Sequence, residues 1–123
     1  MRTLLIVTAV VEAAAGIALA ASPSLVASLL VGSHLDTLTG MLVGRLAGIA
    51  LLTLGLACWL ARNNQQNRVG AGPVAAMLFY NIAVGALLAY ARLGLGLSAI
   101  GLWPVVALHA ILALWCLASL RTA

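Results

Sequence analysis

Four hydrophobic stretches of the chain each contain one strongly polar side chain near the middle: Glu12, Arg45, Asn81 and His109. A charged residue at the centre of a bilayer costs about 2.5–3.5 kcal/mol on insertion scales, so it persists only beside a partner, a cavity or a functional site. Arg45 begins about 9 Å from the end of its stretch and is long enough to reach inward, so all four can share one layer. We predict a contact between Glu12 and Arg45, direct or through one water, with Asn81 or His109 hydrogen-bonded to the same pair.

Two interpretations of this group of side chains stay open. The functional interpretation is a ligand or proton site, lined also by Met77 and Tyr80. Such a site would accept the polar head of a lipophilic molecule such as a quinone, or a proton-coupled small solute. The structural interpretation is a network in which Glu12 and Arg45 neutralise each other's charge. Asn81 and His109 then add interhelical hydrogen bonds. Under the structural interpretation, the protein would be a non-catalytic accessory or assembly subunit of a larger membrane complex.

The composition identifies the chain as an integral membrane protein. Of its 123 residues, 65% are hydrophobic and 7% are charged, and the mean hydropathy is +1.21. A soluble domain has about 25% charged residues, because its surface must be hydrated. We therefore expect lipid to be the exterior solvent, and the length predicts a single domain over residues 1–123.

Four stretches have the length and composition of transmembrane helices. A helix of about 20 residues crosses a hydrocarbon layer of about 30 Å. The predicted spans cover residues 3–21, 39–61, 73–92 and 101–120. The predicted fold is therefore an all-α bundle of four transmembrane helices.

The connection between the first two spans, residues 22–38, predicts a short helix at the outer membrane interface. Ser22 followed by Pro23 is typical of a helix start, and the apolar run that follows ends at Gly32. This helix either covers the end of the bundle or is a plain amphipathic connector.

The first span has a second interpretation as a secretory signal. Arg2, the apolar run and the sequence Ala18-Leu19-Ala20 resemble a signal with a cleavage site. Glu12 would interrupt the apolar core of such a signal, which favours a retained transmembrane helix.

Several kinds of chemistry are disfavoured. The chain has no lysine, which excludes a retinal Schiff base and a lysine nucleophile. His109 and Cys116 share a helix face but lie about 10.5 Å apart along it, too far to ligate one metal ion. Cys58 and Cys116 are expected to be small packing residues. The scattered arginines are not a nucleic-acid footprint.

We favour a protein that is not an enzyme, predict no catalytic or metal-binding residue, and leave a quinone or other lipophilic ligand open.

The arginines predict the orientation of the spans. Arg2, Arg62, Arg68 and Arg121 fall on one side of the four crossings, whereas Arg92 falls on the other. The positive-inside rule therefore places both termini of this multi-pass protein in the cytoplasm. Glycine-rich faces on the second and third spans would permit a homodimer or a larger membrane complex.

The whole chain resembles the small four-helix inner-membrane proteins of bacteria that are grouped with DoxX-like proteins. The resemblance lies in Glu12 with Gly16, Val43-Gly44-Arg45, Tyr80-Asn81, and Leu102-Trp103-Pro104 followed by His109. The DoxX-like group is associated with quinone-linked membrane redox work, so the resemblance implies a quinone-like ligand. It also implies a bacterial inner membrane as the location of the chain. It assigns no role to an individual residue.

Overall fold

The computed structural model describes residues 1–63 and 71–122, and within these ranges the chain is helical and has no strand. Four of the helices are long and apolar enough to cross a membrane, and a short helix lies between the first two of them. The predicted all-α membrane fold is therefore confirmed. The helices are α1 (Arg2–Ala21), α2 (Pro23–Val31), α3 (Leu38–Ala61), α4 (Ala71–Leu93) and α5 (Leu102–Arg121).

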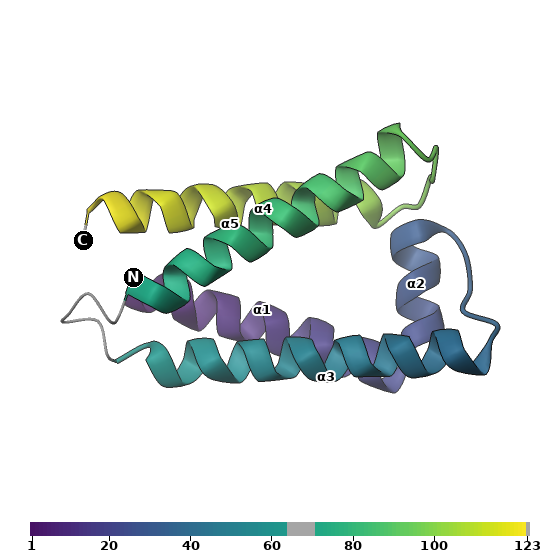
Figure 1. Cartoon of the computed structure of the whole chain (residues 1–123), viewed down its shortest axis with the longest axis horizontal. Helices are drawn as coiled ribbons and strands as arrows, with labels where there is room; N and C mark the ends of the chain where they lie inside the picture. The colour runs from purple at the N-terminus through teal and green to yellow at the C-terminus, as the bar shows by residue number, and fades with distance from the viewer. Residues whose placement is uncertain (64–70, 123) are drawn as a thin grey trace.

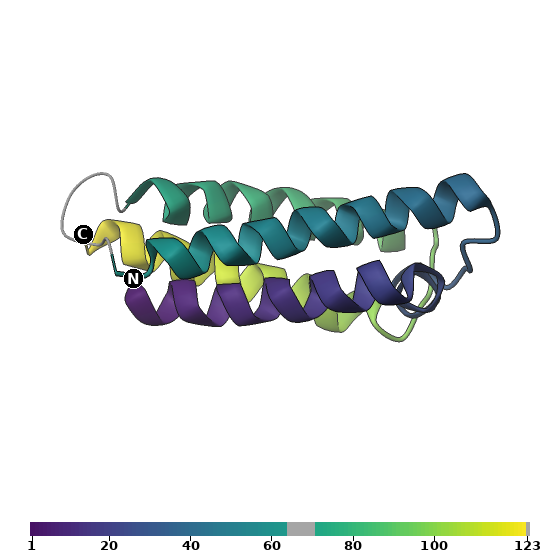
Figure 2. The same ribbon diagram turned by 90° about the horizontal axis from the view of Figure 1, so that it is seen from below.

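The long helices form two antiparallel pairs, and each pair consists of spans that are consecutive in the chain (Figure 1). α1 packs along α3 and α4 packs along α5, whereas contacts between the two pairs are fewer. Both termini lie at one end of the bundle and α2 lies at the other (Figures 1 and 2). We call these the terminal end and the α2 end.

The packing of α1 on α3 depends on glycine. A Cβ atom added to Gly48 would lie 2.5 Å from the backbone nitrogen of Ala20 and 2.8 Å from the carbonyl oxygen of Gly16. The two backbones therefore touch directly, as small residues allow in membrane helices, where lipid removes most of the hydrophobic drive for association. Nearer the terminal end, a Cβ on Gly55 would lie 3.4 Å from the Cβ of Glu12. These contacts fix the register of the pair.

α2 begins and ends at the residues that the sequence predicts. Pro23 occupies the first helical turn, and Ser22 precedes it without a side-chain capping hydrogen bond. Gly32 ends the helix with a φ of 78°, a left-handed conformation that a residue with a side chain rarely adopts.

α2 lies across the α2 end and links the two helix pairs (Figure 1). The backbone N–H of Gly101 donates to the carbonyl oxygen of Leu29 at 2.9 Å, which joins α2 to the start of α5. The backbone N–H of Leu35 donates to Oγ of Ser24 at 3.1 Å, which joins α2 to the segment leading into α3. This short helix therefore holds both pairs at one end.

The apolar core lies in the terminal half of the bundle, where the two pairs meet. Its buried side chains come from all four long helices: Leu4, Leu5, Ala9, Cys58, Val74, Met77, Leu112 and Cys116. Cys58 and Cys116 are free thiols within this cluster, in agreement with their predicted packing role. The outer faces present apolar side chains such as Leu42, Phe79 and Leu114, as lipid requires.

Replacement of Gly48 by alanine tests the backbone contact between α1 and α3. The new Cβ would meet backbone atoms, so the helices must separate, and overpacking of this kind costs about 1–3 kcal/mol. We expect Gly48→Ala to lower the midpoint of thermal unfolding in detergent by several degrees. The control is Gly72→Ala, because an added Cβ at Gly72 has no neighbour within 4 Å. An equal effect of the two substitutions would contradict the contact.

Candidate functional site

Polar side chains from three helices are buried between the two pairs. Thr8, Glu12, Asn81 and His109 are 0%, 3%, 1% and 8% exposed, and Tyr80 is half-buried among them. We call these five residues the interhelical polar group. Thr8 and Glu12 lie one turn apart on α1, while α4 contributes Tyr80 and Asn81 and α5 contributes His109. The sequence predicts four of the five; Thr8 is an addition, and its signal is the four-residue spacing to Glu12 on one helix face.

Tyr80 connects the group across the bundle. Its hydroxyl donates to Oε2 of Glu12 at 3.5 Å, a long hydrogen bond between α4 and α1. Its ring lies 5.8 Å from the imidazole of His109, centroid to centroid, with an angle of 41° between the planes. Tyr80 therefore stands between the carboxylate of one pair and the imidazole of the other.

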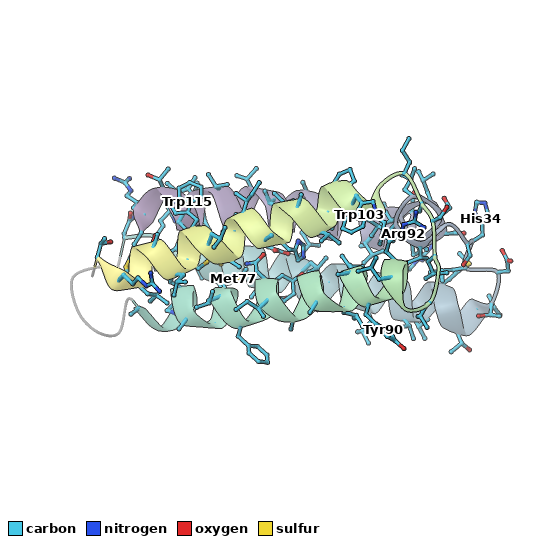
Figure 3. All side chains as sticks on the ribbon, turned by 90° about the horizontal axis from the view of Figure 1, so that it is seen from above. His34, Met77, Tyr90, Arg92, Trp103 and Trp115 are labelled. Carbon is cyan, nitrogen blue, oxygen red and sulfur yellow. The ribbon has the colours of Figure 1, made fainter. Side chains whose placement is uncertain are left out.

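Asn81 is bonded within its own helix. Its Nδ2 donates to the carbonyl oxygen of Met77 at 2.8 Å, and it makes no hydrogen bond to Glu12 in the part of the chain that the structure describes. The Met77 side chain, predicted to line the site, belongs to the apolar core. Figure 3 shows Met77 in the interior, whereas Tyr90, further along α4, points outward.

Unpaired polar atoms are the distinctive property of the group. Within the described ranges, Oγ1 of Thr8, Oδ1 of Asn81 and Nδ1 of His109 are buried and have no hydrogen-bond partner. The great majority of buried polar atoms in proteins are paired, and an unpaired one costs about 1–3 kcal/mol. The group therefore retains hydrogen-bonding capacity toward a further molecule.

Arg45 does not join the group, so the predicted contact with Glu12 is absent from the structure. The Arg45 side chain is exposed on α3, and across residues 1–63 and 71–122 it makes no ion pair or hydrogen bond. The reason is the register of α1 on α3, which brings Glu12 beside Gly55. Arg45 precedes Gly55 by ten residues, a rise of about 15 Å, which is farther than an extended arginine side chain spans.

The surface has an apolar groove and a more polar hollow. The groove, of about 520 Å³, runs between α1 and α3 and is lined by Ala9, Val10, Ala13, Leu52, Gly55, Leu56 and Trp59. It faces lipid, so acyl chains can occupy it. The hollow, of about 270 Å³, lies at the α2 end and includes Arg92. In the described residues, the structure brings no three His, Cys, Asp or Glu side chains together as a metal site would require.

Two double-mutant cycles on thermal stability test this geometry. Glu12→Met and Tyr80→Phe remove the acceptor and the donor of one hydrogen bond, so their effects should be non-additive by about 0.5–3 kcal/mol. Glu12→Gln and Arg45→Gln change residues that do not touch, so their effects should add within about 0.5 kcal/mol. Coupling of Glu12 to Arg45 instead of to Tyr80 would show that the helix register is different.

Comparison of the chain with protein-family models, with curated proteins and with solved structures gave no match. The resemblance to DoxX-like proteins therefore stays a prediction from the sequence. The geometry of the interhelical polar group is the basis for any functional conclusion about this multi-pass membrane protein.

Proposed function

We propose that the interhelical polar group binds the polar head of a small lipophilic molecule, whose apolar part stays among the membrane-spanning helices. The supporting observation is the set of buried, unpaired atoms on Thr8, Asn81 and His109. A purely structural network gains most when every member is hydrogen-bonded. A ligand site instead holds a few convergent polar groups ready within apolar walls.

The charge of the group favours a head that is cationic and donates hydrogen bonds. Glu12 is buried, and no cationic side chain accompanies it in the described residues, because each arginine there is exposed or bonded to a backbone carbonyl near a helix end. An ionised carboxylate at such a depth needs a counter-charge. An ammonium head would supply that charge, and its N–H groups would reach acceptors such as Oδ1 of Asn81. A proton on Glu12 meets the same need, which links ligand binding to proton exchange.

A quinone-like ligand, implied by the DoxX-like resemblance, would use the group differently. Quinone carbonyl oxygens accept hydrogen bonds, and the Tyr80 hydroxyl and the His109 imidazole can donate them. The two ligand classes therefore depend on different residues of the same group: Glu12 for the ammonium, Tyr80 and His109 for the quinone.

Probes with one apolar body and different heads test the proposal. We expect phenylbutylammonium to bind the protein in nanodiscs about tenfold more tightly than phenylbutyrate, a difference of about 1.4 kcal/mol, measured by calorimetric titration. Glu12→Gln should abolish this preference, because it removes the carboxylate but keeps the size of the side chain. Arg45→Gln, at an exposed arginine, is the matched control and should leave the preference unchanged.

The other outcomes of this titration are also informative. Equal binding of both probes and of a short-chain benzoquinone, unchanged by Glu12→Gln, would mean partition into lipid and would contradict the proposal. The quinone could instead bind preferentially and lose this preference in Tyr80→Phe. The interhelical polar group would then still be a ligand site, but the head of its ligand would be a hydrogen-bond acceptor and not an ammonium.

The alternative function is an accessory or assembly subunit in which the polar group holds the bundle together. The observation that favours it is the hydrogen bond from Tyr80 to Glu12, because it joins two helix pairs that otherwise share few contacts. Under this alternative, Tyr80→Phe, which removes the hydrogen-bond donor, would destabilise the bundle, and no probe would bind to the wild-type protein specifically.

For the orientation we propose that the terminal end faces the cytoplasm of a bacterial cell and the α2 end faces outward. Arg2, Arg62 and Arg121 lie near the terminal end of the described chain, and Arg68 lies outside the described residues. Positive residues next to spans are retained on the cytoplasmic side.

Cysteine labelling tests this orientation. Ser33 and Thr122 are exposed at opposite ends, whereas the native Cys58 and Cys116 are buried. A membrane-impermeant maleimide should label Ser33→Cys in intact spheroplasts and Thr122→Cys after lysis. Labelling of Thr122→Cys in intact spheroplasts would reverse the orientation, and labelling of both would contradict the four crossings.

A further inference from the structure

A hollow of about 270 Å³ lies at the α2 end, where the end of α4 and the first turn of α5 meet. Its lining residues are Arg92, Ser98, Ala99, Ile100 and Trp103. None of them belongs to the interhelical polar group, so the hollow is a separate feature. Figure 3 shows Arg92 and Trp103 together at this end of the bundle.

Arg92 provides this hollow with a positive charge and unused hydrogen-bond donors. Its Nη1 donates to the carbonyl oxygen of Leu97 at 3.2 Å, which holds the guanidinium against the α4–α5 connection. Arg92 makes no ion pair in the described part of the chain. A guanidinium has several N–H groups in a planar fork that matches the oxygens of a phosphate. Donors therefore remain on Arg92 for an anion in the hollow.

The start of α5 adds to the positive potential. Its first turn contains no acidic residue, and the N-cap residue, Gly101, has no side chain that could cap the helix. The beginning of a helix has a partial positive charge, which favours an anion nearby. At this helix start the N–H groups of Gly101 and Leu102 donate to backbone carbonyl oxygens and Pro104 has no N–H, so the contribution of α5 is mainly this partial charge. Because Trp103 belongs to this first turn and lines the hollow, the helix end and the guanidinium act at the same place.

The hollow lies at the level of the lipid headgroups. α4 has 23 residues and rises about 34 Å, slightly more than a hydrocarbon layer of about 30 Å. Arg92 in its last turn is therefore at the membrane interface. Trp103 and Ile100 are 49% and 86% exposed beside it. An exposed tryptophan at this depth is typical of contact with the glycerol region of lipids.

We propose that this hollow binds the phosphate of a membrane phospholipid. The guanidinium of Arg92 and the hydroxyl of Ser98 donate to the phosphate oxygens, while Trp103 and Ile100 contact the glycerol and the first methylene groups. Glu12 and Asp36, the two acidic residues of the chain, do not line the hollow. An anionic lipid such as phosphatidylglycerol is therefore bound in preference to phosphatidylcholine, whose choline would bring a second positive charge to Arg92.

Native mass spectrometry of the purified full-length protein tests the proposal. Protein is mixed with equal amounts of phosphatidylglycerol and phosphatidylcholine before its release from detergent. We expect the phosphatidylglycerol adduct to fall by about tenfold in Arg92→Gln, because the charged hydrogen bonds are lost. The matched control, Arg45→Gln, removes an exposed arginine that does not line the hollow and should change the adduct by less than about twofold. Ser98→Glu, which places a carboxylate beside Arg92, should also remove the adduct, and it keeps the test available if Arg92→Gln does not fold.

Three results would overturn the proposal. Equal retention of the two lipids by the wild-type protein would show no selection for an anionic lipid. Equal loss in Arg92→Gln and Arg45→Gln would assign the adduct to general surface charge. In a parallel arm with inorganic phosphate alone, Arg92-dependent thermal stabilisation without a lipid adduct would identify a site for a free anion instead of a lipid.

Discussion

The direct contact of backbones between α1 and α3 at Gly16 and Gly48 decides the arrangement of the polar residues. Without side chains between them, the two helices interlock in one register, which places Glu12 beside Gly55. In that register the carboxylate faces the second helix pair and meets Tyr80. The same register leaves Arg45 nearer the α2 end, exposed on α3. An ionisable carboxyl group therefore lies in the interior because of a contact between uncharged residues.

The two helix pairs are joined by polar contacts at two levels. At mid-depth the Tyr80 hydroxyl bonds to Glu12, and at the α2 end the N–H of Gly101 bonds to the carbonyl of Leu29. Apolar packing between the pairs is concentrated in the terminal half. In lipid, apolar surfaces gain little from association, so polar contacts have a larger share in holding helices together than they have in water. The Tyr80–Glu12 hydrogen bond therefore joins the pairs at the depth where Thr8, Asn81 and His109 have buried, unpaired polar atoms.

The sequence predicts much of this structure because membrane helices obey simple geometric rules. The length of the apolar stretches predicts the spans, and a rotation of about 100° per residue predicts the buried faces of Glu12, Asn81 and His109. Arg45 shows the limit of these rules. The distance of Arg45 from the end of its span can be counted in the sequence. The offset of α3 along α1 cannot, because it depends on which glycines of the two helices come into contact. That offset also determines that Tyr80, and not an arginine, reaches the carboxylate.

The division into two consecutive pairs has a consequence for biosynthesis. The ribosome completes α1, α2 and α3 before it makes α4 and α5, and N-terminal units generally fold first. The first pair can form its glycine contact at once, because both helices are then present. Glu12 consequently enters the membrane before Tyr80 and His109 have been synthesised. The favourable transfer free energy that offsets insertion of this carboxylate into the bilayer must come from α1 and α3 themselves. This explains why all residues of 3–21 except Glu12 are apolar, small or threonine. The pair of α4 and α5 then packs against a polar surface that the first pair has already formed. The helices therefore assemble in the order in which they are translated.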